Sequence, residues 1–253
     1  RRIEKAVVKL PKIAPVGPRR LGRFLAGAEI ESARRRGKFI IHELSGDRCQ
    51  VVHLKMTGQF LFGPVPDGWP EHVHLMLRLD GDGALLYRDI RQFGRFYTLT
   101  ARELSEWPTL KNLGPEPFEL TGAGFAEHLA GRRGRVKPLL LNQSFLAGLG
   151  NIYADESLFA AGIHPLQPAE RVGRDKALRL HREMVRILSK AISLRGSTTS
   201  NYVGLRGVGG RFQEQHQVYG KGGRPCPVCG LVIERIVVGG RGTCFCPSCQ
   251  PAP

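Results

Sequence analysis

Cys226-Pro-Val-Cys229 and Cys246-Pro-Ser-Cys249 are two Cys-x-x-Cys pairs separated by sixteen residues. Four thiolates at this spacing suit the tetrahedral shell of one structural zinc ion. Between the pairs, residues 231–238 predict a strand and the Gly-Gly-Arg-Gly segment at 239–242 predicts a tight turn, so we expect a zinc-bound β-hairpin with Arg241 at its tip. The alternative is a pair of disulfides or scattered free thiols. Zinc is favoured because five of the six cysteines lie in the last 28 residues and nothing else suggests secretion.

Two cysteines lie outside these pairs. Cys244 precedes Cys246 by two positions and could compete as a zinc ligand. Cys49 lies on a predicted strand, where a buried thiol is expected.

The chain is strongly basic. Its 253 residues carry a formal net charge of +16, from 38 Lys and Arg against 22 Asp and Glu. This excess indicates a polyanionic partner, with nucleic acid first and an acidic membrane surface second. No apolar run approaches the roughly 18 residues of a membrane span, and there is no signal-peptide core. We therefore expect a soluble, cytoplasmic protein. We also expect it to act as a monomer.

The N-terminal part, residues 1–113, is rich in short β-branched, aromatic or alternating runs separated by Gly, Asp and Pro turns. The clearest runs are 39–44, 50–54, 72–79 and 84–87. Alternation at this density predicts an antiparallel β-sandwich or barrel.

Leu113-Gly114-Pro115-Glu116-Pro117 ends the strand pattern, because two prolines flanking one residue cannot continue a strand or a helix. We place a linker at 114–120, a helical domain at 121–211 and the zinc finger at 212–253. The helical period predicts helices at 124–129, 137–145, 151–161 and 174–194, with Gly196 as a C-terminal cap of the last.

Asn151 opens one of these predicted helices after the segment Ala-Gly-Leu-Gly at 147–150. Backbone N–H groups and the Asn151 amide would then point ahead of the helix, where a phosphate fits. Because Gly-x-Gly before a helix is common, an ordinary helix turn with a capping Asn remains an open alternative.

A set of motifs runs in one order across nearly the whole chain. Through these motifs the sequence resembles the formamidopyrimidine-DNA glycosylase family, which consists of bacterial base-excision repair enzymes related to endonuclease VIII. The resemblance implies an α+β protein of two domains. These are an N-terminal antiparallel β-sandwich, and a C-terminal helical domain with a helix-two-turn-helix motif and a four-Cys zinc finger. It also implies one structural Zn²⁺ and a duplex DNA partner containing oxidised bases. The motifs are Arg35-Arg36-Gly37-Lys38, 53–58 (His-Leu-Lys-Met-Thr-Gly), 87–94 (Tyr-Arg-Asp-Ile-Arg-Gln-Phe-Gly), 113–117, 148–156, 161–165, Phe212-Gln213, Val218-Tyr219-Gly220 and the hairpin ending in Cys249-Gln250.

The resemblance implies catalytic roles for three residues. Lys38 matches a Lys that contacts phosphate near the damaged nucleotide, and Arg241 matches an Arg that holds phosphates beside the lesion and assists elimination. Glu156 matches a carboxylate near the active site. From residue type alone, Lys38 would be a solvated Lys at the start of a strand, and Asp155-Glu156 would be acids favoured near a helix N-terminus.

The resemblance also implies a DNA-binding set. Met56, Arg91 and Phe93, here called the wedge residues, match side chains that fill the gap left by an extruded base; an apolar group and a guanidinium suit an unstacked gap. From residue type alone, Met56 and Phe93 would be assigned to the core. The remaining residues match phosphate-gripping or DNA-contacting positions: His72, Arg133, Lys137 and Asn151.

Residues 197–210 are rich in Gly, Ser and Thr and match the mobile loop that closes over an oxidised purine in the family. A flexible linker is the alternative.

One family feature is absent. The resemblance implies an N-terminal proline whose secondary amine attacks the sugar C1′, followed by a glutamate that handles protons, but no Pro-Glu-Leu-Pro-Glu-Val-Glu segment occurs here. Pro11 and Pro15 are internal, so their nitrogens are amides and cannot act as this nucleophile. Either further residues precede Arg1 in the native protein, or the protein binds lesions without excising them. We expect the former, because the wedge residues and the lesion loop would otherwise have little purpose.

The resemblance therefore implies a DNA-formamidopyrimidine glycosylase with abasic-site lyase activity, which excises 8-oxoguanine and formamidopyrimidines by base flipping and Schiff-base chemistry. Three alternatives stay open: an endonuclease VIII-like glycosylase for oxidised pyrimidines, a catalytically silent binder of damaged DNA, and a nonspecific zinc-ribbon module.

Overall fold

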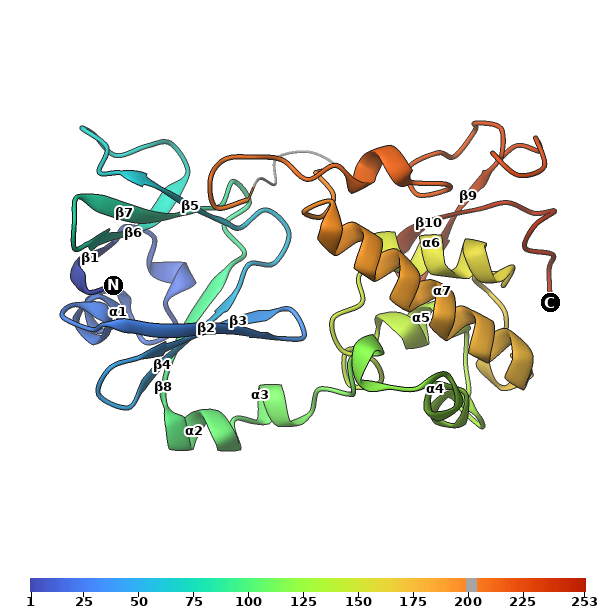
Figure 1. Cartoon of the computed structure of the whole chain (residues 1–253), viewed down its shortest axis with the longest axis horizontal. Helices are drawn as coiled ribbons and strands as arrows, with labels where there is room; N and C mark the ends of the chain where they lie inside the picture. The colour runs from blue at the N-terminus through green and yellow to red at the C-terminus, as the bar shows by residue number, and fades with distance from the viewer. Residues whose placement is uncertain (199–203) are drawn as a thin grey trace. The chain divides into compact units, whose positions relative to one another are not determined.

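The structure is a computed structural model that describes residues 1–198 and 204–253 (Figure 1). The chain divides into two compact units, residues 1–111 with 197–210 and residues 112–196 with 211–253. The segment 197–210 thus groups with the strand-rich unit, whereas the sequence placed it in the helical domain. One reason is that the backbone N–H of Phe62 donates to the carbonyl of Leu205 over 2.7 Å. Residues 199–203 of the expected lesion loop lie outside the described residues.

The first unit contains two four-stranded antiparallel sheets, which confirms the sandwich (Figure 1). Their facing sides form one core, in which Val52 and Phe96 from one sheet lie with Leu75 and Tyr87 from the other. The rings of Tyr87 and Phe96 meet edge to face, with centroids 4.7 Å apart. One sheet has the order β1 (Ile3–Val8), β6 (Val73–Leu79), β7 (Gly83–Arg88), β5 (Gln59–Pro64), and the other has the order β2 (Ile30–Arg36), β3 (Phe39–Leu44), β4 (Arg48–His53), β8 (Arg95–Thr100).

Short helices join or cover these strands. The 3-10 helix η1 (Pro11–Ile13) and helix α1 (Pro18–Leu25) follow β1, and α1 buries Leu21 and Leu25. Helix α2 (Ala101–Glu106) begins with a capping box formed by Thr100 and Glu103, and α3 (Pro108–Lys111) follows it.

The second unit is helical and ends in a β-hairpin. Its core includes Phe125, Leu140, Leu158 and Leu180, one from each of four helices. The elements are η2 (Pro117–Glu119), α4 (Gly122–Leu129), α5 (Val136–Leu141), α6 (Asn151–Ala161), η3 (Ala169–Arg171), α7 (Arg174–Ser193), η4 (Phe212–Gln215), β9 (Glu234–Val238) and β10 (Arg241–Phe245).

The predicted helices are present, and their boundaries differ from the prediction by at most two residues except at the end of α5. Helix α5 ends at Leu141 rather than Phe145, because the Asn142 side chain accepts hydrogen bonds from the backbone N–H and the hydroxyl of Ser144. An Asn in this local arrangement competes with helical hydrogen bonding. At the end of α7, the N–H of Gly196 donates to the carbonyl of Ala191 and Gly196 has φ +84°, as expected of a glycine that terminates a helix.

The expected linker packs against the helical unit. The N–H of Gly114 donates to the carbonyl of Gln143, and a Cβ at Gly114 would lie 2.5 Å from the carbonyl oxygen of Phe145. This close approach requires glycine at position 114. Within the described ranges, every helix is too short or too polar to cross a membrane.

Candidate nucleic-acid interface and zinc site

The four cysteines of the two Cys-x-x-Cys pairs lie together. Their Sγ atoms all fall within 4.8 Å of one another, with 3.9 Å between Cys226 and Cys249 and 3.4 Å between Cys229 and Cys246. A tetrahedral zinc with bonds of about 2.3 Å requires Sγ atoms about 3.8 Å apart. The donor set therefore fits one structural Zn²⁺, as the sequence predicted.

Backbone hydrogen bonds shape the first cysteine pair. The N–H of Cys226 donates to the carbonyl of Leu231, and the N–H of Ile233 donates to the carbonyl of Arg224. Residues 231–233 therefore belong to the metal-binding turn, and β9 begins at Glu234 rather than at the predicted Leu231.

The other two cysteines are separate from this group. Cys244 is buried on β10 and is not among the four clustered thiols, so the expectation that it competes for zinc is wrong. Its backbone N–H donates instead to the Asp155 carboxylate over 3.1 Å. Cys49 is a buried thiol on β4, as predicted.

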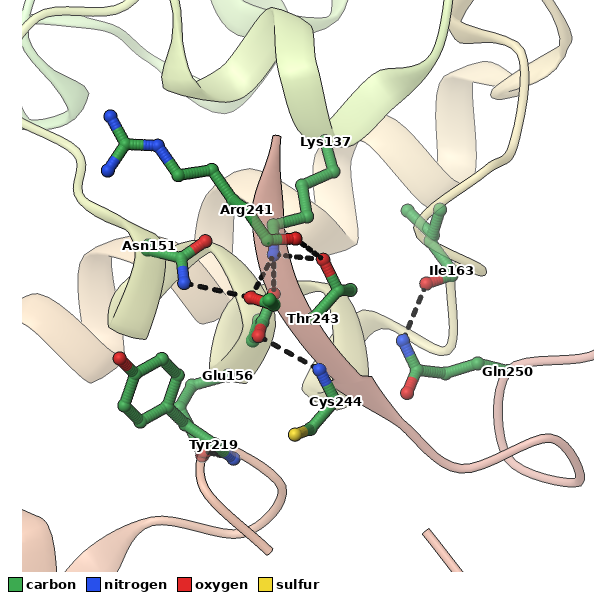
Figure 2. A network of polar contacts seen from close by, with 11 residues as sticks. Lys137, Asn151, Glu156, Ile163, Tyr219, Arg241, Thr243, Cys244 and Gln250 are labelled. Atoms are coloured by element: carbon green, nitrogen blue, oxygen red, sulfur yellow. Dashed lines mark hydrogen bonds and ion pairs between the residues drawn. The ribbon is translucent and has the colours of Figure 1, made fainter. Parts of the chain in front are cut away.

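Lys137 lies inside the second unit rather than on its surface (Figure 2). Its Nζ is 2.6 Å from Asp155 Oδ1 and donates to the Thr243 hydroxyl over 2.6 Å, and its side chain is 0% exposed. Burial lowers the pKa of Lys137 and raises that of Asp155 to about 6, although each partner opposes the shift of the other. The prediction that the Lys137 side chain contacts DNA is therefore wrong: it joins α5 and α6 to β10.

The contacts of Lys137 with α6 and β10 place Asn151, on α6, next to Arg241, on β10. The Asn151 amide donates from Nδ2 to the carbonyl of Gly242 over 3.0 Å, next to Arg241 at the start of β10. Figure 2 shows the Arg241 side chain extending away from the hydrogen-bonded network. The turn preceding Arg241 is made by Gly239 and Gly240 at φ +55° and +72°, values that favour glycine.

Glu156 is buried, and its carboxylate is occupied by backbone amides. It accepts hydrogen bonds from the N–H groups of Gln217, Val218 and Tyr219, at 2.8 to 3.1 Å. This arrangement fixes the segment that carries Tyr219. Glu156 therefore positions this segment, and the catalytic role that the resemblance implies for it stays a prediction.

A hollow of about 510 Å³ lies beside Asn151. Tyr219 and Arg235 line it together with Gly242, which places a phenol and a guanidinium next to the Asn151 amide. Neither side chain was assigned a role from the sequence. The motif Val218-Tyr219-Gly220 was the available signal for Tyr219, whereas Arg235 had none.

The wedge residues lie together on two loops of the first unit. Met56 is 63% exposed and Phe93 is 41% exposed, so the alternative assignment of both to the core is excluded. The guanidinium of Arg91 lies 4.8 Å from the centre of the Phe93 ring, and its Nη1 is 3.0 Å from the Met56 sulfur. Exposed apolar side chains grouped with a cation are typical of a binding surface.

The other basic residues of the predicted set occupy exposed or half-buried positions. Lys38 is exposed beside the Gly37 turn between β2 and β3, and Arg133 is exposed between α4 and α5. His72 is half-buried, with Nε2 3.2 Å from the Glu71 carboxylate and a φ of +61°.

His53, at the end of β4, was not assigned a role from the sequence. Burial first, and then the positive charges of Lys55 and Lys38, together lower its pKa to about 4.

Three family models match the chain in the order expected from the motifs. They are the formamidopyrimidine-DNA glycosylase N-terminal domain over residues 1–96, the H2TH domain of the same enzymes over 113–203, and a zinc finger found in FPG and IleRS over 223–252.

Individual proteins match over the same span. A formamidopyrimidine-DNA glycosylase of Symbiobacterium thermophilum is 42% identical over 100% of this chain and 84% of its own length. Two solved structures of Lactococcus lactis Fpg, a mutant with DNA containing Fapy-dG and a complex with DNA containing an abasic site, each have a TM-score of 0.92. Both are 36% identical and cover 99% of this chain and 93% of their own. The chain therefore belongs to the formamidopyrimidine-DNA glycosylase family.

Proposed function

We propose that the protein is a DNA glycosylase with abasic-site lyase activity that removes 8-oxoguanine and formamidopyrimidines from duplex DNA. The observation that carries this proposal is the match, along essentially the whole chain, to Fpg structures bound to DNA with Fapy-dG or an abasic site. The named relatives give no support to the endonuclease VIII-like, silent-binder or zinc-ribbon alternatives.

Phosphate binding is assigned to groups that lie exposed or half-buried in their own units. Arg241 and Asn151 lie side by side in the second unit, and Arg133 is exposed in the same unit. In the first unit, Lys38 and His72 are proposed to contact the backbone near the damaged nucleotide. Such contacts hold and orient the duplex without reading its sequence. The net charge of +16 adds a long-range attraction for the polyanion.

Extrusion of the damaged nucleotide is assigned to the wedge residues. Rotating one nucleotide out of the stack leaves a gap and costs a few kcal/mol. Met56 and Phe93 offer exposed apolar side chains to this gap, and Arg91 offers donors to an unpaired base. We assign lesion recognition to this group.

The chemistry follows from an amine nucleophile. Its nitrogen forms a bond to the sugar C1′, and the bond from C1′ to the base breaks with the electron pair leaving on the base. The nitrogen loses its proton, and its lone pair then forms the C=N bond as the C1′–O4′ bond breaks and O4′ takes a proton, which opens the sugar ring to a Schiff base. The Schiff base acidifies the C2′ proton, whose removal expels the 3′ phosphate; a second elimination releases the 5′ phosphate. Arg241 and Lys38 are proposed to hold these phosphates as they depart, whereas Glu156 keeps the Tyr219 segment in place.

Borohydride trapping tests this function on the native protein, whose N-terminus is first defined by its intact mass. We expect a covalent adduct with a duplex containing 8-oxoguanine, together with release of the free base. Undamaged duplex serves as the control. Tight binding of the damaged duplex without adduct or base release would show a silent binder, and stronger trapping on oxidised pyrimidines would show the endonuclease VIII-like specificity.

The proposed protein acts as a monomer on chromosomal DNA, and its proposed location is the bacterial cytoplasm.

A further inference from the structure

A buried carboxylate lies directly beneath the wedge residues. Asp89 directly follows β7, is fully buried, and accepts three hydrogen bonds through its carboxylate within the first unit. The donors are the hydroxyl of Thr57, the hydroxyl of Tyr87 at 2.8 Å and the backbone N–H of Gly94 at 2.9 Å. We call Thr57, Tyr87, Asp89 and Gly94 the Asp89 cluster.

The Asp89 cluster joins the two loops that carry the wedge residues. Thr57 directly follows Met56, and Gly94 directly follows Phe93. A further hydrogen bond crosses between the loops, from the backbone N–H of Arg91 to the Thr57 hydroxyl over 3.1 Å. Each wedge residue is thus within one residue of the cluster or bonded to it through its own backbone.

The Tyr87 hydroxyl fills the space between the loops. A Cβ added at Gly58 would lie 2.7 Å from this hydroxyl oxygen, and a Cβ at Gly94 would overlap with it. Both glycines are buried. The loops therefore close onto one phenol, and their separation is set by contacts that leave no room for a side chain at positions 58 and 94.

The ionisation of the cluster favours these bonds. Burial would raise the pKa of Asp89, but the hydrogen bonds from Thr57, Gly94 and Tyr87 outweigh it and hold that pKa below its usual range. Burial, with the adjacent Asp89 carboxylate, raises the pKa of Tyr87, so the phenol stays a donor. A carboxylate accepting several donors makes stronger hydrogen bonds than a neutral acceptor.

We propose that Asp89 and Tyr87 are positioning residues for lesion recognition, because they fix the spacing of Met56 against Arg91 and Phe93 before DNA binds. The inference rests on the proposed function, in which these three side chains enter one gap in the duplex. Two loops can fill one gap only if their tips are held at a fixed separation, and preorganisation lowers the ordering cost of binding. Neither Asp89 nor Tyr87 needs to touch DNA for this effect.

The test uses full-length protein carrying Asp89→Asn or Tyr87→Phe. Tyr97→Phe is the matched control, because Tyr97 lies in the same sandwich on β8 and packs against Trp107. Two quantities are measured: the ratio of affinities for a duplex with a stable abasic-site analogue and for undamaged duplex, and the fluorescence of 2-aminopurine placed beside the lesion. We expect each test variant to lower the affinity ratio about tenfold, which corresponds to the loss of one hydrogen bond to a charged group.

Thermal unfolding of each variant separates positioning from a merely structural role. Positioning predicts a reduced affinity ratio and a reduced 2-aminopurine signal at temperatures where the variant is fully folded, with Tyr97→Phe unchanged in both. An unaltered ratio in folded Asp89→Asn and Tyr87→Phe would overturn the inference.

Met56→Ala and Arg91→Ala distinguish that failure from failure of the proposed function. If these two variants lose lesion preference while Asp89→Asn keeps it, only the positioning role is wrong. If they too keep full preference, the wedge assignment itself is wrong, and the positioning role is wrong with it.

Discussion

Asp155 and Glu156 are adjacent on α6, yet each carboxylate binds a different segment of the chain. Asp155 pairs with Lys137 and accepts the N–H of Cys244 on β10, while Glu156 accepts three N–H groups from residues 217–219. Asn151, one turn earlier on the same helix, donates to Gly242. Helix α6 thus holds both β10, which carries Arg241, and the segment 217–219, which carries Tyr219.

The Lys137–Asp155 pair gives a stability prediction. Lys137→Met should destabilise the protein by about 3–5 kcal/mol, because it leaves the Asp155 carboxylate buried without its cation. Urea unfolding measures the change. Lys111→Met is the control: the Lys111–Glu106 pair has the same 2.6 Å separation but exposed side chains, so its loss should cost no more than about 1 kcal/mol. Equal effects of the two substitutions would contradict the buried-pair interpretation.

His53 gives a prediction on pH. Its folded pKa is about 4, against about 6.5 when unfolded, so between these values the unfolded chain binds more protons than the folded one. The free energy of unfolding should therefore decrease as the pH falls from 6.5 to 4. His53→Asn should flatten this decrease, because Asn does not titrate and can accept the Lys55 N–H that His53 Nδ1 accepts at 2.9 Å. Unfolding by urea at pH 7, 6 and 5 measures the slope of the free energy of unfolding against pH. The same slope in His53→Asn and in the unchanged protein would contradict the lowered pKa of His53.

Single residues show where sequence reasoning succeeds and where it fails. The four zinc ligands were predictable because chain spacing alone brings each pair together. Lys137 was misplaced because a Lys on a short helix gives no sign of its burial, which depends on Asp155 and on a strand about a hundred positions later. The Asp89 cluster was missed for the same reason: its partners Thr57 and Asp89 are 32 positions apart.

Among the elements of the first unit, the four strands with the clearest alternating or β-branched runs were predictable, and the polar β2 was not. The run at 39–44 matches β3, and the helix at 151–161 matches α6. β2 has the sequence Ile-Glu-Ser-Ala-Arg-Arg-Arg and is largely exposed at the edge of its sheet, so neither alternation nor apolar content marks it. It is held by backbone pairing with β3, which sequence periodicity does not report.

The hairpin of β9 and β10 gives a metal-dependent prediction. Cys226→Ser should release zinc and abolish DNA binding, because metal binding and folding of such a hairpin are coupled and the hairpin carries Arg241. Zinc content by mass spectrometry and duplex affinity measure the two effects. Cys49→Ala, a buried cysteine in the other unit, is the control and should keep both zinc and DNA binding. Full DNA affinity in zinc-free Cys226→Ser would contradict the structural role of the metal.

For the whole molecule, we expect the net positive charge to set the affinity for any duplex and the wedge residues to set the preference for damaged duplex. The basic surface should attract any duplex, with an affinity that falls steeply as salt increases. Arg241→Ala should weaken binding to damaged and undamaged duplex alike and reduce the slope of log affinity against log salt by about 1. Arg91→Ala should instead weaken binding to the damaged duplex more. Equal losses on both duplexes for Arg91→Ala would mean that Arg91 is only a phosphate contact.

The most direct test of the account is a crystal structure of the full-length protein with a duplex that contains a stable abasic-site analogue. We expect a bent duplex with the damaged nucleotide rotated out of the stack. Met56, Arg91 and Phe93 should occupy the gap, while Asn151 and Arg241 should contact the phosphates. A straight, fully stacked duplex, with Met56 away from the bases, would contradict extrusion of the damaged nucleotide by the wedge residues.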